Sequence, residues 1–118
     1  DNVSVKQVDP NDRWTLGTNW SIEDGKAVGT STTKSIKQLN TLTVGNTYEL
    51  TFTISDYSQG SLKSNIGGVD GTTRSGNGTF TEIATATNAH FYFDGVSAFT
   101  GKIDNVSVSE YAITPLDV

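Results

Sequence analysis

The sequence predicts an all-β domain built as a sandwich of two antiparallel sheets. The 118 residues are rich in Gly, Ser, Thr and Asn and poor in Lys, Glu, Leu and Ala, so they contain little helix-forming material. No stretch shows a sustained apolar period of 3.6 residues, whereas several show period two. About nine short strand-like segments follow one another at regular spacing, which is typical of a sandwich. Periodicity alone does not separate an immunoglobulin-like sandwich from a jelly roll.

Four short strands are expected before the middle of the chain, and turn residues such as the EDGK segment at 23–26 separate them. They are Val3–Val8, Trp20–Ile22, Ala27–Val28 and Ile36–Leu42.

The clearest strand is the segment TYELTFTIS at 47–55, in which apolar and polar residues alternate strictly. Its apolar side chains are Tyr48, Leu50, Phe52 and Ile54. Turn residues precede it at Gly45-Asn46, and the polar segment SDYSQGS at 55–61 predicts a loop after it.

Four more strands are expected in the second half of the chain: Leu62–Ile66, Phe80–Ala84, Phe91–Phe93 and Ile103–Tyr111. The segments GGVDG, SGNG and FDG between them predict turns. Asn77-Gly78 predicts a tight hairpin, because both residues tolerate a positive φ angle.

The pentapeptide DNVSV occurs at residues 1–5 and again at 104–108, so the two copies start 104 − 1 = 103 residues apart. Chance in a Ser/Val-rich chain is one explanation. We interpret the repeat instead as the mark of a tandem array, since the spacing matches one sandwich domain. Residues 1–9 then repeat the last strand of a preceding unit, and residues 10–118 form the sandwich. The first segment would pair with its own domain or be donated to a neighbouring subunit.

The second copy of the repeat also predicts a β-bulge. Phe99, Gly101 and Ile103 share one parity, whereas Val106 and Val108 share the other. One extra residue at Asp104-Asn105 would return both sets to the same face of the sheet.

Several classes of function are disfavoured by composition. The net charge of −5, from 8 basic and 13 acidic residues, argues against nucleic-acid binding. No apolar run is long enough to span a bilayer. Cysteine is absent and His90 is the only histidine, so neither a disulfide nor a zinc site is expected. There is no Gly-x-Ser-x-Gly elbow and no phosphate-binding loop, and we predict no catalysis.

Four segments carry a resemblance to a known family. They are WTLGTNWSIEDGKAVG, LTVGNTYELTFTISDYSQGSLKSNIGG, GTTRSGNGTFTEIATA and FTGKIDNVSVSE, within Arg13 to Glu110. Together they resemble a repeated module of phage tail-fibre and virion-surface proteins. That module is similar in turn to jelly-roll carbohydrate-binding modules with a galactose-binding-like fold. The resemblance implies a jelly roll and a repeated context.

The resemblance also implies a structural calcium ion. Such jelly rolls take one ligand from an aspartate of the final strand, and Asp104 is the matching position. Glu23 and Asp24 are the candidate partners near the first strands, although the usual Asn-Gly-Gly-Phe-Glu pattern is absent. Calcium requires six to eight oxygen ligands. The alternative is that Asp104 accepts hydrogen bonds from backbone N–H groups at the bulge.

Two groups of residues are candidates for sugar binding, because aromatic rings stack on the apolar face of a pyranose. Tyr57 lies in the polar segment after the clearest strand, with Asp56 and Gln59 beside it. The alternative is a tyrosine that closes the end of the sandwich. Trp14 and Trp20 are the only tryptophans; core packing is expected for both, and Trp14 is kept as a candidate.

The second group is a row on one strand face. Tyr92 faces opposite to Phe91 and Phe93, and His90 and Asp94 share its face. This row predicts either a polar binding surface or an ordinary cross-strand ladder.

The sequence therefore predicts a non-enzymatic module of a virion surface or tail fibre that adheres weakly to cell-surface polysaccharide. It would lie outside the cell or on a virion, and its partners would be copies of itself or neighbouring repeats. One alternative is a purely structural spacer, decoration or filament subunit joined by strand exchange. Another is an accessory carbohydrate-binding domain of a secreted bacterial enzyme.

Overall fold

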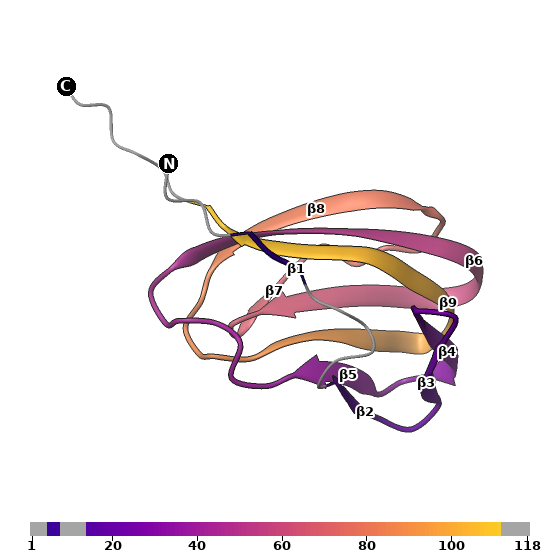
Figure 1. Cartoon of the computed structure of the whole chain (residues 1–118). Coiled ribbons are helices and arrows are strands. Elements are labelled where there is room, and N and C mark those ends of the chain that lie inside the picture. Colours follow the sequence, from indigo (N-terminus) through magenta and orange to yellow (C-terminus); the bar gives the residue numbers. More distant parts are fainter. Residues whose placement is uncertain (1–4, 8–13, 112–118) are drawn as a thin grey trace.

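The structure, a computed structural model, describes residues 5–7 and 14–111, and every regular element in these ranges is a β-strand (Figure 1). No helix in these ranges is long and apolar enough to cross a membrane. The strands are β1 (Val5–Gln7), β2 (Trp14–Leu16), β3 (Trp20–Glu23), β4 (Lys26–Thr32), β5 (Ser35–Gln38), β6 (Thr47–Ile66), β7 (Val69–Asp70), β8 (Gly78–Thr85) and β9 (Phe91–Glu110).

Two strands of 20 residues each, β6 and β9, run antiparallel to one another and pass through both layers of a sandwich. The first part of β6 and the last part of β9 form the upper layer of Figure 1 with β8. The second part of β6 and the first part of β9 form the lower layer with β7, β5 and β2. The hairpin of β3 and β4 adds to β9 near its bend.

The loop predicted at 55–61 is wrong, because β6 continues through this segment. Its pairing register with β9 shifts on either side of Gln59, and Asp56 and Gly60 have φ angles of 49° and 73°. The predicted FDG turn is likewise part of β9, which bends further on, where Ser97 and Ala98 have positive φ. Bulges let a strand turn a corner while most backbone groups keep their partners, so turn-forming residues mark bends here and not chain reversals.

The tight hairpin predicted at Asn77-Gly78 is also wrong. β7 and β8 both pair with β6 and not with each other. Gly78 begins β8 opposite Ile54, and the Asn77 side chain accepts a hydrogen bond of 2.9 Å from the backbone N–H of Tyr57. The strand predicted at 36–42 ends at Gln38, since the chain turns at Asn40 with a φ of 57°.

The alternation predicted for 47–55 is confirmed, because its four apolar side chains are buried between the layers. Phe52 contacts Phe93 of the other layer edge-on, with ring centroids 5.1 Å apart. Trp20 is buried as expected and its Nε1 donates a hydrogen bond of 2.8 Å to the carbonyl of Lys34. The buried apolar side chains of both layers form one core cluster.

The bulge predicted in the repeat is confirmed. Thr51 lies opposite Ser107 and Thr53 lies opposite Asp104, so β9 holds one residue more than β6 in this interval. Asn105 takes up the extra length with a φ of 53°. The apolar side chains before and after the bulge consequently point into the same core.

Val5, the last residue of the first copy, and the two residues after it pair with β9 at the end of the second copy. β1 pairs antiparallel with β9, and Val5, Lys6 and Gln7 stand opposite Ser109, Val108 and Ser107. The other residues of the 1–9 segment lie outside the described residues. The proposed boundary at residue 10 also lies outside them, and it stays a prediction.

Candidate functional site

Tyr57 lies at the bend of β6, where its side chain serves the fold. Its hydroxyl donates a hydrogen bond of 2.6 Å to the carbonyl of Gly60. Its ring packs on the core, 6.4 Å from the ring of Phe99 between centroids. This arrangement supports the interpretation that Tyr57 closes the end of the sandwich.

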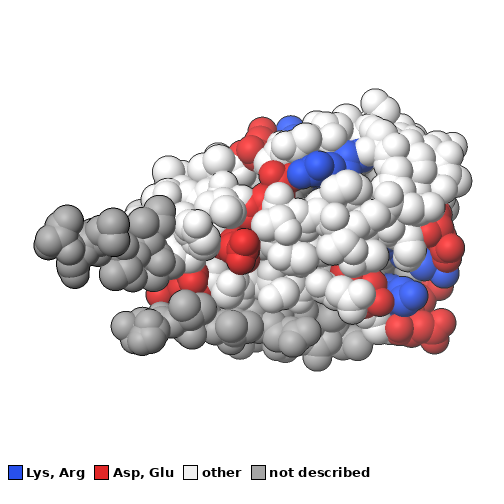
Figure 2. All heavy atoms as spheres, turned by 90° about the horizontal axis from the view of Figure 1, so that it is seen from above, with Lys and Arg blue, Asp and Glu red and all other residues white. Residues whose placement is uncertain are grey.

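Asp56 and Gln59 are held by neighbouring elements at the same bend. The carboxylate of Asp56 forms an ion pair of 3.0 Å with Lys102. Gln59 Nε2 donates to the carbonyl of Ala98 at 2.9 Å and to the hydroxyl of Ser31 at 3.2 Å. Figure 2 shows acidic and basic side chains next to one another at this end of the molecule. The Tyr57 hydroxyl, the Asp56 carboxylate and the Gln59 amide nitrogen therefore each have a partner within the protein.

The residues proposed for calcium do not form a cluster of acidic side chains in the described part of the chain. Asp104 Oδ1 accepts a hydrogen bond of 2.8 Å from the N–H of Asn105, and its Oδ2 lies 3.9 Å from the ammonium group of Lys26. Glu23 accepts a hydrogen bond from Ser21, and no three His, Cys, Asp or Glu side chains gather among the described residues. Asp24 forms the turn between β3 and β4. The alternative, in which Asp104 caps the bulge, agrees with these contacts.

Trp14 is half-buried in β2 and packs on the core, with its ring centroid 5.9 Å from that of Phe91. The side chain of Phe91 points inward from β9, whereas Tyr92 takes the opposite face. The two aromatic candidates, Trp14 and Tyr92, therefore lie on opposite faces of the lower layer and do not form one binding surface.

The outer face of the lower layer gathers polar side chains around Tyr92. Tyr92 lies opposite Lys37 of β5 on one side and opposite Asn65 of β6 on the other. In the next row, Asp94 lies between Ser35 of β5 and Lys63 of β6. We call this surface the Tyr92 face, defined by Ser35, Lys37, Lys63, Asn65, Asp70, Tyr92 and Asp94.

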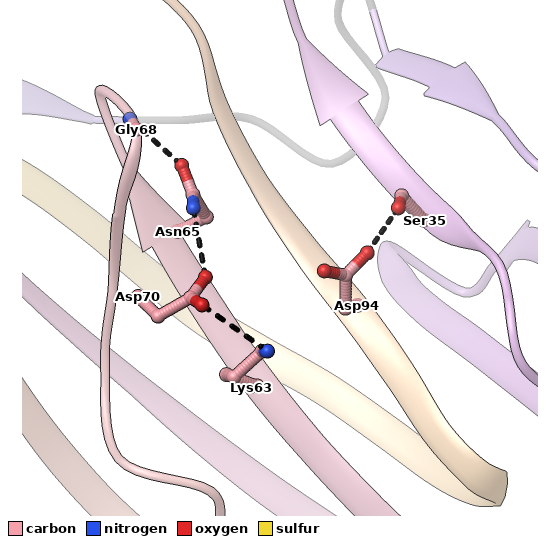
Figure 3. A network of polar contacts seen from close by, with 6 residues as sticks. All are labelled: Ser35, Lys63, Asn65, Gly68, Asp70 and Asp94. Atoms are coloured by element: carbon pink, nitrogen blue, oxygen red, sulfur yellow. Dashed lines mark hydrogen bonds and ion pairs between the residues drawn. The ribbon is translucent and has the colours of Figure 1, made fainter. Parts of the chain in front are cut away.

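Hydrogen bonds fix several of these side chains (Figure 3). Asn65 is 4% exposed; its amide donates to Asp70 at 2.8 Å and accepts from the N–H of Gly68 at 2.8 Å. Lys63 pairs with the same aspartate at 3.3 Å. These contacts lower the pKa of Asp70, with the Asn65 hydrogen bond the largest cause, so its carboxylate stays charged at neutral pH.

Tyr92 presents a neutral phenol on this face. Burial raises its pKa, and the negative charges of Asp94 and Asp70 add to the rise. The Lys37 ammonium lies 5.5 Å from the centroid of its ring. Ser35 donates a hydrogen bond to Asp94. The result is an aromatic ring surrounded by oriented donors and acceptors.

A hollow of about 400 Å³ adjoins the Tyr92 face and shares Ser35 and Lys37 with it. It lies over the paired strands β2 and β5 and the segments next to them, and is lined by Thr15, Leu16, Gly17, Thr18, Thr33, Lys34, Ser35 and Lys37.

The sequence predicted that Tyr92 and Asp94 share one strand face, but it did not predict that Lys37 and Asn65 lie beside Tyr92. His90, which was expected in the same row, precedes β9, and its Nδ1 accepts a hydrogen bond of 3.2 Å from the N–H of Asn40. Alternation shows that Lys37 and Asn65 point outward, but no sequence signal gives the strand register that places them beside Tyr92.

No family model matches this sequence, and no curated protein matches it. Several solved structures have the same fold. A CBM35 carbohydrate-binding module from Paenibacillus barcinonensis aligns at 18% identity over 92% of this chain and 99% of that one, with a TM-score of 0.62. The C-terminal CBM6 of the marine laminarinase LamC from Zobellia galactanivorans aligns at 10% identity over 92% and 100%, also with a TM-score of 0.62. A CBM4 module aligns at 18% identity over 92% and 86%, with a TM-score of 0.51.

These likenesses confirm the predicted fold class, a jelly-roll β-sandwich. The open choice between an immunoglobulin-like sandwich and a jelly roll is thereby resolved.

Proposed function

We propose that the protein is a non-enzymatic carbohydrate-binding module that holds a polysaccharide on the Tyr92 face. The observation that carries this proposal is the position of Tyr92, whose ring lies on the outer sheet face between Lys37 and Asn65. An aromatic ring stacks on the C–H face of a pyranose, and fixed polar groups around it bond the sugar hydroxyls. The likeness to carbohydrate-binding modules supports the same function.

Binding at one exposed face would be weak, and many copies would convert it into avidity. The context of a virion surface or tail fibre follows from the sequence resemblance and stays a prediction, as does the extracellular location. A place beside a catalytic domain of a secreted bacterial enzyme is compatible with the same surface. The intact mass of the native polypeptide distinguishes a single module from an array or an enzyme.

Replacing Tyr92 by alanine is expected to weaken glycan binding by about fivefold or more, because a stacked ring contributes on the order of 1 kcal/mol or more. Binding is measured on a glycan array with the multivalently displayed chain, and then by affinity electrophoresis. Y92F, which keeps the ring, should retain most of the affinity.

Tyr111→Ala is the matched control, since this tyrosine is 40% exposed and follows β9 outside the Tyr92 face. Wild-type affinity in Y92A would refute the proposed site. Loss of binding in a folded Tyr57→Ala variant, with Y92A unaffected, would move the site to the bend of β6. No binding to any glycan would refute the function itself.

A purely structural module in a repeated or multimeric assembly is the second candidate, and the pairing of β1 with β9 favours it. β1 is joined to the rest of the fold chiefly through this one edge, so the same segment of a neighbouring copy would find the same pairing groups.

Deleting residues 1–9 is expected to change the oligomeric state, measured by light scattering, and to lower the melting temperature, because the edge of β9 loses its partner strand. An unchanged mass and melting temperature would exclude strand exchange.

A further inference from the structure

We propose that the polysaccharide is anionic, and that its carboxylate or sulfate groups are held by Lys34 and Lys37 at the hollow beside Tyr92. This inference rests on the proposed function and names the class of its ligand. Two observations carry it: the distribution of charge over the described residues, and the hollow over the paired strands β2 and β5.

The two lysines differ from the other Lys and Arg side chains of residues 14–111. Four basic side chains form ion pairs with carboxylates: Lys26 with Asp104, Lys63 with Asp70, Arg74 with Glu82 and Lys102 with Asp56. Among the described residues, Lys34 and Lys37 have no carboxylate within 4 Å, and both are exposed. Two uncompensated cations thus line one hollow in a chain whose net charge is −5.

The acidic groups nearby are already engaged by partners. Asp94 accepts the hydroxyl of Ser35, and Asp70 is engaged by Lys63 and Asn65. An incoming anion therefore meets Lys34 and Lys37 as the free charges, while hydroxyl groups of Thr15, Thr18 and Thr33 line the same hollow as donors.

Lys37 connects the hollow with the stacking surface. Its ammonium lies over the Tyr92 ring, and an exposed cation–π contact of this kind is weak. An acidic group in the hollow would draw this flexible side chain off the ring, and the ring would then accept the pyranose. A neutral sugar offers no such exchange, so the arrangement selects acidic glycans.

The test compares polysaccharides that differ only in charge. Polygalacturonate is compared with its methyl ester, and a sulfated galactan with its unsulfated form, by affinity electrophoresis and calorimetry at low and high salt. We expect the intact chain to bind an acidic form at least about tenfold more tightly than its neutral partner, and the difference to shrink in high salt because exposed charges are screened. A preference for polygalacturonate over its ester would identify the carboxylate as the bound group, and a preference for the sulfated galactan would identify the sulfate.

In the double variant Lys34→Gln/Lys37→Gln, the acidic and the neutral form of each pair should bind with equal affinity, whatever the absolute affinity becomes. Lys26→Gln, a lysine paired with Asp104 on another strand, is the matched control and should behave as wild type. Equal binding of acidic and neutral forms, or a preference that survives the double variant, would overturn the inference. If either result were found and Y92A still abolished binding of neutral glycans, only the preference for an anionic polysaccharide would be refuted. Carbohydrate binding at the Tyr92 face would remain supported.

Discussion

Replacing Phe52 by alanine is expected to lower the free energy of unfolding by about 3–5 kcal/mol. Phe52 is 1% exposed and touches rings from both layers, Phe93 at 5.1 Å and Phe80 at 5.7 Å between centroids. Alanine would leave a cavity between two sheets whose backbones are fixed by β6 and β9, so the site has little freedom to collapse. A small domain has only about 5–15 kcal/mol of stability, and the loss is therefore a large part of the total.

Urea unfolding followed by tryptophan fluorescence measures this effect. Ile83→Ala is the matched control, because Ile83 lies on the neighbouring strand β8 with 50% of its surface exposed, and its loss should cost less than about 1 kcal/mol. A Phe52→Ala variant as stable as the control would show that the two layers are not packed through this ring.

The sequence predicts those features of this fold that depend on the parity of side chains along a single strand. Alternation in 47–55 indicated the buried face of β6, and the change of parity at Asp104-Asn105 indicated the bulge of β9. In both cases the apolar side chains must reach one core, and each residue added to a strand reverses the face that follows.

The bends of the two long strands were beyond this reasoning. Asp56, Gly60 and Ser97 are residue types common in turns and have the positive φ angles of turns. The strand nevertheless bends there without reversing and continues into the other layer. Whether a polar segment reverses the chain or bends a strand depends on the partner strand, which here lies about 40 residues away in the sequence.

The candidate site was partly predictable for the same reason. The parity of β9 placed Tyr92 and Asp94 on the outer face, whereas Lys37 and Asn65 join them only through the registers of β5 and β6 with β9. Tyr57 looked equally suitable, because the sequence does not show that its hydroxyl is bonded to Gly60.

Gly60→Ala is expected to lower the free energy of unfolding by about 2–5 kcal/mol, the second large effect. Gly60 has a φ of 73° at the bend of β6, and a Cβ there would lie 2.6 Å from both the carbonyl oxygen of Ser97 and the N–H nitrogen of Phe99. Both contacts are backbone atoms of β9, which cannot move aside without breaking the pairing of the two long strands.

Gly25→Ala separates the two causes. Gly25 has nearly the same φ, 75°, but no atom lies within 4 Å of the position that a Cβ would take, so alanine there carries only the backbone penalty of about 1–2 kcal/mol. The difference between the two variants in urea unfolding measures the clash alone. Equal losses would mean that β6 and β9 separate easily at their bends. A larger loss for Gly60→Ala would show that this close crossing, which also brings Asp56 to Lys102 and Gln59 to Ala98, holds the two layers of the sandwich in register.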